Sequence, residues 1–170
     1  MSNNIIDGDA AGETFLRPGC VCYPCGGWYG DHPELGSFVP EKHLKLGQWD
    51  WDWTKWSQKI ELYPITKMIS GVDLIKLEES EISLNINFAA HFLKFTHQIP
   101  RAWGKFSLVF SGTIVHNPLF TDRGFQDRQV FIMYFDSLSC PKDWEGRWVD
   151  LGRCVFSNTW KNVIPRVRVL

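Results

Sequence analysis

Three cysteines near the N-terminus carry the clearest metal-binding chemistry in the sequence. Cys20, Cys22 and Cys25 are followed seven residues later by His32. Three thiolates and one imidazole form a ligand set that can bind Zn²⁺ tetrahedrally. The Cys-X-Cys-X2-Cys spacing differs from the common paired spacing, however, so free thiols and a disulfide are the alternatives. Free thiols are expected of a protein made in the cytosol, and we predict no bound cofactor.

A row of tryptophans suggests a second kind of chemistry. Trp49, Trp51 and Trp53 alternate with Asp50 and Asp52 in the segment QWDWDW, a pattern typical of a strand with one aromatic face. Exposed rings in a row could stack on sugars, as in a carbohydrate-binding module, whereas buried rings would belong to the core. The two carboxylates have no His nearby in the sequence, so we expect them to be solvated rather than to act as a catalytic acid pair.

No recognisable catalytic motif occurs in the sequence. It lacks a Ser, His and Asp set in a familiar local context, a Gly-rich phosphate loop and an HExxH motif. His91 and His97 have no Cys or carboxylate at ligand spacing, so we interpret them as structural or surface histidines. We therefore expect a protein that is not an enzyme.

Composition and charge further limit the kinds of fold and of binding partner that we expect. The chain has 170 residues, enough for one domain with a full core, and its nine Trp and twelve Phe favour a β-rich fold. Its net charge is −1, and residues 1–14 contain no basic run, which argues against an arm that binds nucleic acid through phosphates. No apolar stretch approaches the about 20 residues that span a bilayer, so we expect no membrane insertion.

The pattern along the chain predicts an antiparallel β-sandwich with one short helix. Residues 1–36 are rich in Gly and Pro and predict an extended arm anchored by Trp28, whereas residues 37–170 predict the sandwich domain. The helix is expected over residues 87–96, with Asn87 as its cap, and residues 60–82 allow either strand or helix. Strands are predicted over residues 48–53, 105–115 (half-buried), 130–135 (buried on both faces), 148–156 and 163–170.

The order of these features resembles the capsid jelly roll of picorna-like viruses. The resemblance covers roughly residues 38–170. It rests on the order of four segments: LKLGQWDWDW, HFLKFTHQIPRAWGKFSLVFSGTIV, RQVFIMYFDSLSCP and RWVDLGRCVFSNTWKNVIPRV. The family's jelly roll continues for about two further strands, and the chain ends within an alternating strand. We therefore expect a bare final strand, in a sandwich that is incomplete until another chain supplies the missing strands.

The resemblance implies a structural role in a virion. Copies of the chain would assemble with other capsid subunits into an icosahedral shell around RNA, which they would contact only indirectly, and assembly would take place in the host cytoplasm. The arm around Trp28 would run along the inner surface of the shell or clamp a neighbour. The core between the sheets would be filled by Trp103, Phe106, Phe110, Tyr134 and Trp148. The alternative is a carbohydrate-binding sandwich that uses Trp49, Trp51 and Trp53.

Overall fold

The fold is described from a computed structural model of the chain. The residues it describes are 4–10, 39–77, 82–116, 128–138, 143–151 and 155–168. The candidate zinc ligands Cys20, Cys22, Cys25 and His32 lie outside these residues, as does Trp28.

The described part of the chain is mostly β, with a few short helices. Its strands are β1 (Ile5–Asp7), β2 (Val39–His43), β3 (Gln48–Asp50), β4 (Ile60–Pro64), β5 (Ile69–Ser70), β6 (Ser107–His116), β7 (Arg128–Asp136), β8 (Asp143–Asp150), β9 (Val155–Phe156) and β10 (Asn162–Val167). Its α-helices are α1 (Trp56–Lys59), α2 (Gly71–Leu77) and α3 (Ile86–Lys94). Short segments of 3-10 helix cover Trp53–Lys55, Thr96–Gln98 and Arg101–Lys105.

Six strands form one mixed sheet in the order β4-β10-β6-β7-β8, with β2 also paired to β6. β6, β7 and β8 are consecutive antiparallel strands, and β2 and β4 pair antiparallel with β6 and β10. β10 instead runs parallel to β6, through Asn162 opposite Ser107 and Val163 opposite Leu108. The prediction that all strands pair antiparallel is therefore wrong for β10 and β6. The β10–β6 pairing is short because β2 pairs with the other end of the same edge of β6.

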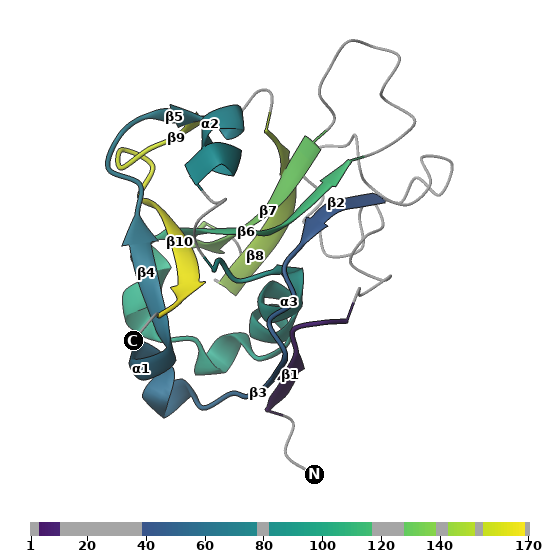
Figure 1. The fold of residues 1–170 in the computed structure, drawn as a ribbon. Coiled ribbons are helices and arrows are strands. Elements are labelled where there is room, and N and C mark those ends of the chain that lie inside the picture. The colour runs from purple at the N-terminus through teal and green to yellow at the C-terminus, as the bar shows by residue number, and fades with distance from the viewer. Residues whose placement is uncertain are drawn as a thin grey trace.

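The side chains of the sheet alternate between two apolar clusters, one on each face. The first cluster includes Leu108, Phe110, Phe131, Met133 and Trp148, and the second includes Val109, Val130, Ile132, Val149 and Ile164. Figure 1 shows α3 and the β1–β3 pair below the sheet, and α2 and the β5–β9 pair above it. β6 is thus buried on both faces from Leu108 to Val115, which corrects the half-buried strand predicted from its alternation.

The helix predicted from its Phe spacing is α3, and it begins slightly earlier than expected. Asn85 is its N-cap, and its side-chain oxygen accepts a hydrogen bond from the backbone N–H of Asn87 at 3.1 Å. The predicted cap Asn87 lies within the first turn. The prediction of only one short helix was also wrong, because α1 and α2 are present as well. Both helices are too short for a helical spacing of apolar residues to be recognised in the sequence.

Two predicted strands have different bounds in the structure. The strand predicted over residues 48–53 ends at Asp50, because Asp52 caps a 3-10 turn that begins at Trp53. The strand predicted over residues 148–156 is two strands: β8, which starts at Asp143, and β9, which pairs with β5. Local alternation does not distinguish one long strand from two short ones that join different sheets.

The last described strand, β10, is not an unpaired edge. Val163 to Val167 pair with β4 on one side, and Asn162 and Val163 pair with β6 on the other. Arg166 of β10 forms an ion pair with Glu61 of β4, and its guanidinium carbon lies 3.8 Å from the ring centroid of Tyr63. The prediction of a bare final strand is therefore wrong for β10.

Candidate functional site

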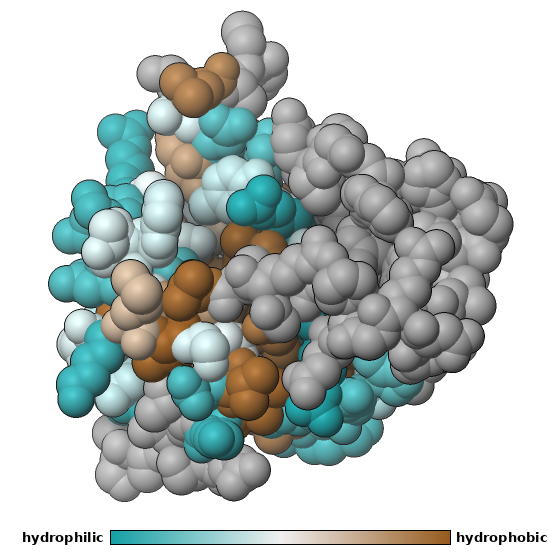
Figure 2. All heavy atoms as spheres, turned by 90° about the horizontal axis from the view of Figure 1, so that it is seen from above, coloured by the Kyte–Doolittle hydropathy of each residue, from teal (hydrophilic) through white to brown (hydrophobic). Residues whose placement is uncertain are grey.

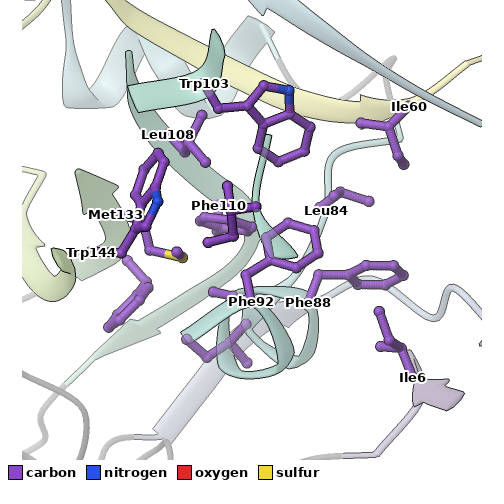
Figure 3. Close-up of a cluster of buried hydrophobic side chains, with 14 of the residues drawn as sticks. Ile6, Ile60, Leu84, Phe88, Phe92, Trp103, Leu108, Phe110, Met133 and Trp144 are labelled. Atoms are coloured by element: carbon purple, nitrogen blue, oxygen red, sulfur yellow. The ribbon is translucent and has the colours of Figure 1, made fainter. Parts of the chain in front are cut away.

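The residues predicted to fill the core differ in burial. Trp103, Phe110 and Trp148 belong to the first cluster and are at most 3% exposed. Phe106 is partly buried against that cluster, and Tyr134 is partly buried against the second cluster, on the opposite face. Figure 3 shows Phe92 projecting from α3 toward Phe110 and Phe88 pointing away from Phe110, toward the side of Ile6. The ring centroids of Phe92 and Phe110 are 6.0 Å apart.

The tryptophan row packs into the same first cluster. Trp51 is 1% exposed, and its ring meets Trp53 edge-on at 5.1 Å between centroids and Phe92 at 5.1 Å. Trp49 is partly buried against Phe88, and its indole N–H donates to the carbonyl of Leu46 at 2.7 Å. The three rings therefore form no flat exposed platform of the kind that sugar stacking requires. The carbohydrate-binding alternative loses the surface on which it depended.

The carboxylate of Asp52 has a structural role. Its Oδ1 accepts hydrogen bonds from the backbone N–H of Thr54 at 2.9 Å and from the Thr54 hydroxyl at 2.6 Å. These bonds, led by the one from the hydroxyl, lower the pKa of Asp52. Asp50 is exposed on β3. A general acid that acts near neutral pH needs a raised pKa, and the pKa of Asp52 is shifted in the opposite direction.

Three of the histidines in the described ranges are packed against other side chains or exposed, whereas His116 Nδ1 lies 3.5 Å from the carboxylate of Glu41. His91 is buried on α3 with its ring 4.8 Å from that of Phe95, and burial lowers its pKa, assisted by Lys94. His97 is exposed. His43 Nδ1 lies 2.9 Å from Thr113 Oγ1, and burial lowers its pKa too. Across the described residues, no three His, Cys, Asp or Glu side chains are arranged to hold a metal ion.

A groove lies on the face of the sheet that carries the second apolar cluster. Of its lining residues, only Tyr134 was named as a candidate from the sequence. It has a volume of about 400 Å³ and is lined by Ile132 and Tyr134 of β7, Arg147 of β8, Phe156 of β9 and Trp160. The Tyr134 hydroxyl donates to Glu145 Oε2 at 3.3 Å, and burial raises the pKa of Tyr134 to about 12. Arg147 and Trp160 were not predicted as groove residues. They lie on different elements, β8 and the turn before β10, and only the folded chain brings them to the same groove.

Large apolar side chains are exposed in several parts of the chain. Figure 2, which views the molecule from the side of α2 and the β5–β9 pair, shows apolar residues at the surface among hydrophilic ones. The most exposed are Leu138 (93%), Met68 (71%), Trp160 (67%) and Ile5 (61%). They follow β7, precede β5, precede β10 and begin β1, so they do not belong to one element.

Comparisons with protein-family models, with curated proteins and with solved structures found no match. Each helix within the described ranges is too short or too polar to span a bilayer.

Proposed function

We propose that the chain is a structural capsid subunit of a picorna-like virus, which packs with other subunits into an icosahedral shell around RNA. The resemblance over residues 38–170 supports this function, and the mostly β fold with a six-stranded sheet agrees with it. The proposal places the protein in the virion, and in the host cytoplasm during assembly.

The observation that carries the proposal is the distribution of exposed apolar anchors. Leu138, Met68 and Ile5 lie in three different parts of the chain, each at least 61% exposed. Large apolar and aromatic side chains are typical of the buried centres of protein interfaces. A subunit that contacts several neighbours needs such anchors on several sides, whereas a binding module needs them at one site.

The proposal includes a jelly roll completed by strands of another chain. Within the described residues, β8 pairs only with β7 and β4 only with β10. The outer edges of β8 and β4 thus have no further strand partner within the described ranges, and backbone N–H and C=O groups at such an edge are the groups that an added strand would pair with. Strand addition from a neighbouring subunit would remove both edges.

The size of the purified full chain tests this function. We expect sedimentation velocity to show species larger than a monomer that increase with concentration, and negative-stain images to show closed particles or their fragments. Leu138→Ser should weaken association about 10-fold, the size of effect typical of an interface anchor. Lys67→Ser, also at an exposed position, should leave association unchanged. A chain that is monomeric at every concentration contradicts the proposal.

A further inference from the structure

The groove on the second face of the sheet has an apolar floor and a wall with one charged group. Ile132, Val149 and Phe156 are each at most 9% exposed and provide the apolar lining. Arg147 lies beside Ile132, which is its direct partner across the β7–β8 pair. Trp160 borders the groove and is 67% exposed. The groove therefore combines a cation with aromatic and aliphatic surface.

Arg147 has no carboxylate partner among the described residues. Its Nε is buried and has no hydrogen-bond acceptor there, and its guanidinium carbon lies 5.6 Å from the ring centroid of Tyr134. The nearby carboxylate of Glu145 accepts instead from the Tyr134 hydroxyl. Arg166 on β10, by contrast, pairs with Glu61. Arg147 lines the groove with its charge unpaired by any carboxylate in the described ranges, so an anion that reaches its guanidinium from the groove would be bound favourably.

We propose that the groove binds a small aromatic carboxylate. The carboxylate accepts hydrogen bonds from the Arg147 guanidinium, and the ring system lies between Trp160 and the apolar floor. About 400 Å³ suits a ligand of one or two rings, because small-molecule sites start near 300 Å³. This site goes beyond the proposed shell function and does not depend on it.

The chemistry of the lining favours this occupant over a phosphate. Arg147 is the one Lys or Arg among the described lining residues, so it matches a single negative charge. Apolar surface around the cation favours an anion with an apolar body over a fully hydrated one. The exposed Trp160 ring offers a flat surface against which an aromatic ligand can stack.

Calorimetric titration of the full chain with two matched probes tests the site. Naphthalene-2-carboxylate carries the charge, and 2-naphthamide has the same rings without it. We expect the carboxylate to bind about 10-fold more tightly, because a hydrogen bond to a charged group is stronger than a neutral one. Arg147→Gln should abolish that preference. Arg101→Gln, which removes an exposed guanidinium outside this groove, should keep it.

A second variant keeps the test valid if Arg147→Gln fails to fold. Trp160→Ala alters an exposed side chain and should weaken both probes by a similar factor. Inorganic phosphate, titrated in the same way, should bind more weakly than the carboxylate. The proposal is overturned if neither naphthalene probe binds, if both bind equally, if phosphate binds more tightly, or if a folded Arg147→Gln variant keeps the preference.

Discussion

Asn85 joins three segments of the chain through one buried side chain. Its oxygen caps α3, and its Nδ2 donates to the carbonyls of Gly8 at 2.7 Å and Leu44 at 2.8 Å. Asn85→Ala removes the cap and leaves two carbonyls without this donor. We expect the free energy of unfolding to fall by about 3 kcal/mol, measured by urea denaturation.

Two further substitutions separate the contributions at this position. Asn85→Asp retains an oxygen for the cap but cannot donate to Gly8 and Leu44, so it should lose most of the same free energy. Asn87→Ala removes bonds to Asp7 and Ala10 that are exposed, and it should cost less than about 1 kcal/mol. Equal effects of Asn85→Ala and Asn87→Ala would contradict this account.

His91 should make the stability of the fold depend on pH. Burial lowers its pKa from 6.5 in the folded chain, so the unfolded chain binds the proton more readily. The free energy of unfolding is then highest above pH 6.5 and falls as the pH drops from 6.5 toward the folded pKa. His43, whose pKa is also lowered, adds to the effect in the same direction.

The pH dependence can be assigned with matched histidine variants. We expect thermal denaturation between about pH 7.5 and 5.5 to show a smaller pH dependence for His91→Leu than for the unchanged chain. His97→Gln alters an exposed histidine and should keep the full dependence. The role of His91 is refuted if both variants respond to pH like the parent.

At the level of elements, β6 depends on a close backbone approach at Gly112. A Cβ at this position would lie 2.5 Å from the carbonyl oxygen of Ser83 and 2.8 Å from that of Leu84. Gly112 also donates to the Leu84 carbonyl at 3.1 Å and accepts from Leu44 at 2.8 Å. Gly112→Ala must displace the backbone at residues 83 and 84, and we expect a loss of about 2 kcal/mol or more in urea denaturation.

Gly104→Ala is the matched control for this substitution. A Cβ at Gly104 would meet only Phe135, at 3.8 Å, which is an ordinary contact. Its effect on the urea midpoint should be within about 0.5 kcal/mol of zero. If Gly112→Ala is as harmless as Gly104→Ala, the close approach at β6 is not as the structure describes it.

The sequence predicts best the elements in which a regular pattern of apolar residues extends over many consecutive positions. β7 is buried on both faces from residue 129 to 133, as its apolar run indicates, but Phe135 near its end is 37% exposed. The helix α3 follows the spacing of Phe88 and Phe92. β1 has three residues and is held by pairing with β3, so no periodicity can identify it. The groove could not be foreseen either, because Arg147 and Trp160 line it from β8 and from the turn before β10, which are separated in the sheet by β6 and β7.

For the whole molecule, one sheet supports both apolar clusters. Along β6, Val109 belongs to the second cluster, while its neighbours Leu108 and Phe110 belong to the first. Loss of order in this strand therefore exposes both clusters at once. The same alternation in β7 and β10 couples the layer that contains α3 to the layer that contains α2.

This coupling predicts a single unfolding transition. Near-UV circular dichroism reports the first cluster, whose tryptophans include Trp51, Trp103 and Trp148, and hydrogen exchange in α2 reports the second. Both signals should change at the same urea concentration. Leu74→Ala, in the second cluster and 0% exposed, should lower both midpoints together, by about 2–5 kcal/mol in unfolding free energy. If α2 exchanges at a lower urea concentration than the tryptophan signal changes, the two layers unfold separately, and the shared sheet does not couple them.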